Sequence, residues 1–240
     1  MILSLSLPNQ YRFFMKISKI RSHFSSARIN RYLIATGNNN SRAIKLYKHN
    51  LRVSQSFLPV LSILEVTIRN GINTIMTSHF TDPDWIINQK NGFMSHASLT
   101  YRHPVTNRIV HNHFLKKCVE KSENKLTRHG LPLSSGKIIS DQNFGFWTEL
   151  FELTFYRILS GRPIQIFTNL PPNTNRIDVL NRLDKIRNFR NRISHSEPIC
   201  FQNNNIDFTN AIDVHNTIME LFDWIDPELR KLIKDIDSVS

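Results

Sequence analysis

A chain of 240 residues, 40% of them hydrophobic, is long enough to bury a core, and we expect one folded domain. Lysine and arginine number 31 against 19 aspartates and glutamates, so the formal charge is +12 and the expected partner is a polyanion, nucleic acid before an anionic membrane surface. The 7 glycines disfavour a turn-rich sandwich or a glycine-loop nucleotide fold, and the 2 cysteines form neither a metal motif nor a disulfide framework.

The first half of the chain has the apolar spacing of helices. A helix is predicted over residues 28–36. A longer pattern runs from Ser41 to about residue 78, where Pro59 either bends one helix or separates a helix over 41–56 from another over 57–78.

The second half continues the helical pattern. Residues 88–105 look irregular, a loop is expected over 131–136, and Thr174 should cap a helix that runs to about Ser196. Further helices are predicted over residues 111–126, 144–159 and 209–224.

These elements predict an all-α protein with a single domain over residues 25–228. A basic and aromatic segment over residues 1–24 precedes the domain, and a tail over residues 229–240 follows it. The tryptophans are expected in the core, and they are Trp85, Trp147 and Trp224.

No sign of export or membrane insertion is found. The start, MILSLSLPNQ, is apolar but short, lacks a cationic lead and is broken by Pro8, so it is a poor signal peptide. No stretch approaches the roughly 18 apolar residues of a membrane-spanning helix. We therefore expect a cytoplasmic protein without a membrane partner, in keeping with its free cysteines.

The predicted helix over residues 176–196 carries the side chains that point to chemistry. At about 100° per residue, Arg187, Asn191 and His195 form one row, and Arg190 lies between that row and the apolar face. Arg190, Asn191 and His195 can therefore converge on one groove. The apolar face, which we expect to be buried, consists of Val179, Leu183, Ile186, Phe189 and Ile193.

These residue types suit the cleavage of RNA without a metal. Histidine can move the proton of the ribose 2′-hydroxyl near neutral pH, and arginine can hold the phosphate as charge accumulates on it. Asparagine can orient either group. On spacing alone, a basic solvated face with a capping histidine is the simpler alternative.

Three segments resemble a known family. RNRISHSEPI at residues 190–199 resembles its RNRIAHHEPI-type signature, and NFGFWTELF at 143–151 resembles its Phe-Gly-x-Trp segment. Residues 25–72 resemble its amino-terminal block of Ser-x-x-Arg, Leu-Tyr-x-x-Asn and Leu-Glu-x-x-x-Arg-Asn. The chain thus resembles the abortive-infection Abi-like family (AbiD/AbiF-type) of the HEPN superfamily, over most of residues 25–200.

The resemblance implies a HEPN-like helical bundle with additional helices and a metal-independent endoribonuclease without a cofactor. Carried onto this chain, the motif makes Arg190 and His195 the catalytic pair, with Asn191 beside them. It implies a homodimer through this helix and products with a 2′,3′-cyclic phosphate and a 5′-hydroxyl. Ser196 replaces a histidine that family members often carry, but the catalytic position is filled by His195.

The family context further implies a toxin that acts in abortive infection during phage defence, held silent by an RNA or a protein antitoxin. Two alternatives remain open from the sequence. The chain could be a module that binds RNA without cutting it, or an interaction protein whose helix pair serves only to form a dimer.

Glu65, Arg69 and Asn70 are predicted to support the site. Glu65 and Arg69 have the spacing of a helical ion pair, which is the simpler explanation. We nevertheless expect Glu65 and Asn70 to contact the groove of Arg190 and His195, because apolar neighbours mark this helix as one that faces the core.

Other cations and histidines lie outside these motifs. The basic series that includes Arg12, Lys16 and Lys19 is interleaved with aromatic residues and is expected to bind RNA. The alternative is that it binds a partner protein or a membrane surface. His111 and His113 are predicted on opposite sides of a helix, so no metal site is expected. The cations expected to bind RNA are Arg12, Lys16, Lys19, Arg28, Lys116, Lys117, Arg187 and Arg192.

Overall fold

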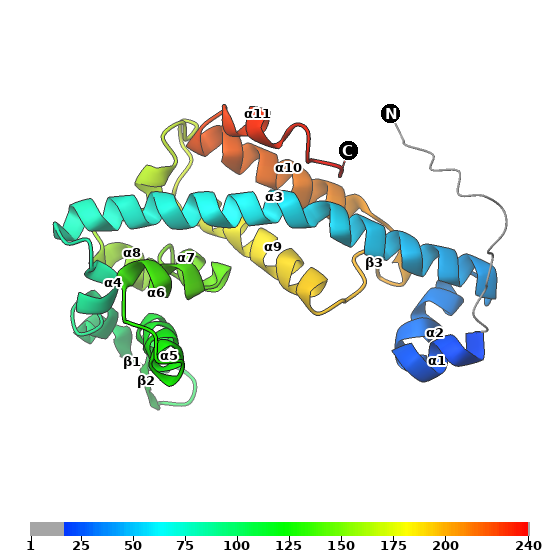
Figure 1. Cartoon of the computed structure of the whole chain (residues 1–240), viewed down its shortest axis with the longest axis horizontal. Coiled ribbons are helices and arrows are strands. Elements are labelled where there is room, and N and C mark those ends of the chain that lie inside the picture. Colours follow the sequence, from blue (N-terminus) through cyan, green and yellow to red (C-terminus); the bar gives the residue numbers. More distant parts are fainter. Residues whose placement is uncertain (1–16, 240) are drawn as a thin grey trace.

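The structure is a computed structural model that describes residues 17–239 (Figure 1). Of these residues 67% are helical and 5% lie in strands, which confirms the all-α class. The strands form two short antiparallel hairpins rather than a sheet layer. Arg12 and Lys16, both predicted to bind RNA, lie outside the described residues.

One long helix, α3 (Asn40–Phe80), runs along most of the molecule (Figure 1). Its start is capped by Asn39, whose side chain accepts a hydrogen bond from the backbone N–H of Arg42 at 3.0 Å. Pro59 lies inside the helix, so of the two expectations the single helix is correct.

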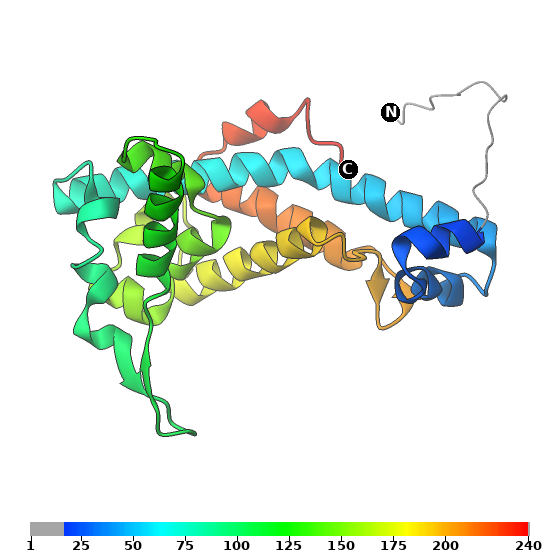
Figure 2. The same ribbon diagram turned by 60° about the horizontal axis from the view of Figure 1, so that its bottom comes forward.

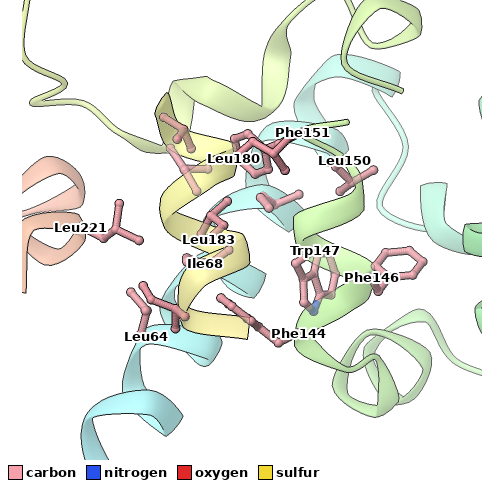
Figure 3. Packing of buried hydrophobic residues seen from close by; sticks show 14 of the residues in the cluster. Leu64, Ile68, Phe144, Phe146, Trp147, Leu150, Phe151, Leu180, Leu183 and Leu221 are labelled. Carbon is pink, nitrogen blue, oxygen red and sulfur yellow. The ribbon is translucent and has the colours of Figure 1, made fainter. Parts of the chain in front are cut away.

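The core is built where α3 meets α9 (Arg176–Ser194) and α10 (Thr209–Ile225) (Figures 1 and 2). Figure 3 shows Leu183 of α9 beside Ile68 of α3, with the aromatic side chains of Phe144 and Trp147 packed nearby. Burying one such leucine or phenylalanine contributes about 2 kcal/mol, so this packing fixes α9 against α3. The predicted apolar face of α9 is buried, with Ile193 half-buried at its end.

The boundaries of α9 differ slightly from the prediction. Asn175, not Thr174, caps its start, because the Asn175 side chain accepts from Ile177 N while its own N–H donates to Asp178. The helix ends at Ser194, and His195 is the residue that follows the last turn.

The region between α3 and α9 shows the largest differences from the predicted elements. A hairpin of β1 (Thr100–Arg102) and β2 (Ile109–His111) begins in the last part of the stretch expected to be irregular and takes in the first residue of the helix predicted from 111. His111 and His113 therefore do not lie on opposite sides of a helix, and their ring centroids are 5.6 Å apart. The helices of this region are α4 (Trp85–Asn88), α5 (Phe114–Arg128), α6 (Ser135–Asp141), α7 (Phe144–Glu149) and α8 (Leu153–Ile158), with 3-10 turns at Phe93–Ser95, Ala97–Leu99 and Arg162–Ile166.

Two of these helices correct the sequence prediction directly. α6 begins inside the predicted loop over residues 131–136, because the Ser134 side chain caps it by accepting from Lys137 N. The predicted helix over 144–159 is divided into α7 and α8, since Glu152 is extended and starts α8. The three tryptophans are buried, as predicted.

A second, smaller core lies at the amino-terminal end of α3. There α1 (Ile17–Phe24) and α2 (Ser26–Ala35) pack with the hairpin of β3 (Phe201–Gln202) and β4 (Asn205–Ile206) (Figure 2). Residues 17–24 of the predicted flanking segment are therefore helical. The predicted tail contains α11 (Leu229–Ile233), and the carboxylate of Asp237 accepts a hydrogen bond from His215 Nε2 at 2.8 Å.

α3 is also long and apolar enough to cross a membrane by the criteria of length and composition. This corrects the expectation that no stretch approaches that limit. Within the structure the apolar side chains of Phe57, Leu64, Ile68 and Ile72 are packed in the core.

Candidate functional site

A groove between α3 and α9 brings Arg190 next to Glu65. The Oε2 atom of Glu65 lies 3.7 Å from Nη2 of Arg190, and the two side chains are 22% and 35% exposed. The carboxylate can steady the guanidinium while other N–H donors of Arg190 stay accessible. The groove has a volume of about 210 Å³ and is lined by Leu58, Leu61, Ser62, Glu65, Arg190, Ile193 and Ser194.

The positions of Glu65 and Arg190 follow from the packing of their helices. Glu65 comes directly after Leu64, which is 1% exposed, and Arg190 comes directly after Phe189, which is 2% exposed. Because both neighbours are held in the core, the two charged side chains meet at the edge of the helix contact. This is the contact that we expected of Glu65.

The other two supporting residues are placed differently. No ion pair joins Glu65 to Arg69 among residues 17–239, so the simple helical pair is not formed. Asn70 is exposed; its backbone carbonyl accepts from the hydroxyl of Thr74, and its side chain makes no hydrogen bond to residues 17–239. The expected contact between Asn70 and the groove is therefore absent from the described residues.

His195 and Asn191 lie at the exposed end of α9, outside the lining of the groove. Ser194, adjacent to His195, does line it. Of the three side chains that were expected to converge on one groove, only Arg190 lines it within a single chain. His195 presents an open imidazole on the surface next to that groove.

The turn that follows His195 is held by three separate elements. Arg28 of α2 donates to the carbonyl of Ser196 at 2.8 Å, and Arg192 of α9 donates to the carbonyl of Pro198. The buried side chain of Asn50 on α3 accepts from the backbone N–H of Ile199 at 2.8 Å. These contacts fix the backbone on the carboxyl-terminal side of His195.

Several cations predicted to bind RNA have internal partners instead. Arg28 and Arg192 hold the turn described above, and Arg187 donates to Thr148 at 3.0 Å and pairs with Asp184 at 2.9 Å. Lys116 donates to the side chains of Asn91 and Ser95. Lys19 and Lys117 are exposed.

Sequence reasoning missed Asn50 as a supporting residue. The clue in the sequence is that helical spacing places this polar residue among buried positions. In the structure its side chain is only 2% exposed. An amide buried on a helix needs a partner, and the turn after His195 supplies it.

A polar cluster lies at the end of α7, where Glu149 comes close to charged residues of α9. Asn112 donates to Glu149 at 3.1 Å, while Arg187 and Asp184 lie nearby. Burial raises the pKa of Glu149, because the charged carboxylate loses its hydration there. Within residues 17–239 no group of three histidine, cysteine or acidic side chains is arranged to hold a metal ion.

The segments that carry the family resemblance therefore meet around one end of α9. Arg28 and Asn50 contact the turn that follows α9, Glu65 contacts Arg190 within that helix, and Thr148 of the central segment contacts Arg187 one turn earlier. In comparisons with known proteins, no family model, no curated protein and no solved structure matches the chain.

Proposed function

We propose that the protein is a metal-independent endoribonuclease of the HEPN type, with a HEPN-like bundle as its fold and its active site at the end of α9. The observation that carries this proposal is the contact of Glu65 with Arg190 beside a turn that three elements hold in place. An exposed imidazole next to a steadied guanidinium is the pair of groups that phosphodiester cleavage requires.

In the proposed reaction, the imidazole of His195 accepts the proton of a ribose 2′-hydroxyl. The 2′-oxygen then attacks the adjacent phosphorus, and the bond from phosphorus to the 5′-oxygen breaks. A protonated imidazole returns a proton to the leaving 5′-oxygen, so the products are a 2′,3′-cyclic phosphate and a 5′-hydroxyl. Arg190 neutralises the charge that builds on the phosphate oxygens.

The active unit we propose is a homodimer joined along α9. Each chain carries one motif, while the reaction needs both a base and an acid. Asn191 and His195 are exposed at the helix end, so a second copy could meet them without rearrangement of the core. His195 of the second copy would then serve as the acid.

The biological role in this proposal is that of a cytoplasmic toxin in phage defence, kept silent by an RNA or protein antitoxin. The support is the sequence resemblance together with the +12 charge, which favours binding to RNA.

The test is cleavage of total RNA and tRNA in EDTA by protein stripped of copurified RNA. His195→Ala is expected to lower the rate at least about a hundredfold, the usual contribution of acid–base catalysis. His129→Ala is the matched control, because His129 occupies the same position at the end of α5 with nearly the same backbone angles. Equal rates for all three proteins would contradict the proposal.

A second candidate function is an RNA-binding module that does not cut. The observation in its favour is that His195 lies outside the lining of the groove that contains Arg190. Binding of RNA by all three proteins without cleavage by any would select it.

A further inference from the structure

An uninterrupted row of exposed side chains runs along α3 toward the candidate site. Successive members are three or four positions apart, so each is the surface neighbour of the next along the helix. Every member is exposed. The row consists of Lys45, Lys48, Arg52, Gln55, Leu58 and Ser62.

The first half of this row is cationic and has no acidic neighbour in sequence. Residues 1–64 contain no aspartate or glutamate, so α1, α2 and the start of α3 contribute only positive charge to this end of the molecule. A surface hollow of about 560 Å³ is lined by Lys45, Lys48, His49 and Arg52 together with Leu46.

The three cations of the row have no partner among the residues that the structure describes. Within residues 17–239, Lys45, Lys48 and Arg52 form no ion pair and no side-chain hydrogen bond. Arg28, Arg187 and Arg192 contrast with them, since each of those is bound internally. Three free cations on one helix are therefore available to an external anion.

The second half of the row ends in the candidate site. Leu58 and Ser62 are members of the row, and both line the groove that holds Glu65 and Arg190. The distance along the helix axis from Lys45 to Glu65 is about 30 Å at 1.5 Å per residue. A strand that lies on the cations can thus continue into the groove.

We propose that this row is a binding track for one strand of RNA, which delivers a phosphodiester to the end of α9. The inference rests on the proposed function only in taking the end of α9 as the place to which the strand is delivered. That the row binds RNA is argued from its cations alone. The cations stand about 5 Å apart along the axis in a row one residue wide, which suits a single phosphate backbone. Net charge alone would not favour this face over others, but the continuity with the groove does.

The experiment is a binding titration with fluorescent 2′-O-methyl RNA of about 15 nucleotides, within the range of single-strand site sizes. The 2′-O-methyl group prevents cleavage, so binding is measured whether or not the protein is a nuclease. The track variant is K45Q/K48Q/R52Q. The control is K121Q/R128Q/K137Q, which also removes two lysines and one arginine, but from exposed positions on α5 and α6. Equal melting temperatures establish that both variants fold.

We expect the track variant to bind at least about tenfold more weakly at low salt, and the control to bind within about twofold of the original protein. Loss of three phosphate contacts should also lower the slope of log K against log salt by about 2, at roughly 0.7 per contact for a single strand. An equal loss in both variants would overturn the track, as would no binding of RNA at all. Loss of binding to phosphatidylserine vesicles with RNA binding unchanged would assign the row to a membrane instead and overturn it.

The outcome is separable from that of the nuclease test. If track-dependent binding is found but unmodified RNA is never cut, the track stands and the nuclease proposal fails. If RNA is cut with equal KM by the original protein and the track variant, the nuclease stands and the track fails.

Discussion

Glu65 of α3 and Arg190 of α9 face each other across a groove, with 3.7 Å between Oε2 and Nη2. Both side chains are partly exposed, so the pair contributes only about 0–1 kcal/mol to stability. A pair of this kind is better explained as a means of orienting the guanidinium than as a source of stability.

Replacement of Glu65 by glutamine tests that interpretation. We expect kcat for RNA cleavage to fall about tenfold, equivalent to about 1.4 kcal/mol, with KM and melting temperature nearly unchanged. Glu120→Gln on α5 makes the same chemical change at a half-buried position away from the groove and should be neutral. An unaltered kcat in Glu65→Gln would remove Glu65 from the site.

The buried amide of Asn50 gives a prediction about stability. Asn50→Ala leaves the N–H of Ile199 without its partner, so the free energy of unfolding should fall by about 1–3 kcal/mol in a urea titration. Asn181→Ala, at an exposed position of α9, should change it by less than about 0.5 kcal/mol. If the two variants were equally stable, Asn50 would not anchor the turn after His195.

Arg28→Ala tests the same turn from α2. Loss of the hydrogen bond to Ser196 should slow RNA cleavage because the backbone beside His195 becomes freer. Stability should change by only about 1 kcal/mol, since the arginine is half-buried and makes one such bond. Unchanged cleavage would mean that the position of this turn does not matter to the site.

Glu149 predicts a dependence of stability on pH. Burial raises its pKa in the folded protein above that in the unfolded chain, so the folded state binds more protons between the two values. Ionisation of Glu149 therefore lowers stability as the pH rises through that window. Glu149→Gln keeps an oxygen to accept from Asn112 and should be more stable than the original protein at about pH 7.

The advantage of Glu149→Gln should shrink as the pH falls toward about 4, because the carboxyl is then mostly protonated in both states. Urea titrations of the two proteins at both pH values measure this. A difference that does not depend on pH would show that the charge is not its cause.

The thiol of Cys200 gives a chemical prediction. Burial raises its pKa to about 11, so the thiolate fraction at neutral pH is about a hundredfold lower than for a free cysteine. Cys200 should react with a disulfide reagent only on the timescale of unfolding. Rapid modification in the folded protein would contradict its burial.

The sequence predicted the parts of the fold that depend on helical periodicity. The buried face of α9 and the extent of α10 follow directly from apolar spacing, and Glu65 was expected near Arg190 because α3 bears a core-facing stripe. The hairpin at β1 and β2 was missed because three-residue strands carry too few residues to show alternation.

The site residues were harder to assign because side-chain partners are tertiary. In the sequence, Arg28 and Arg187 cannot be told apart from arginines that are free on the surface. In the structure, Arg28 donates to the carbonyl of Ser196, and Arg187 is bound to Thr148 and Asp184. Lys45 and Lys48 were overlooked for the opposite reason, since exposure along a row is visible only once the helix is packed.

The end groups of the RNA fragments test the central proposal most directly. Total RNA treated in EDTA with the original protein should yield fragments that end in 2′,3′-cyclic phosphate and begin with 5′-hydroxyl. His195→Ala should yield none above background. Fragments with 3′-hydroxyl ends, or the same cyclic ends from both proteins, would contradict the assignment of His195 as the catalytic acid and base.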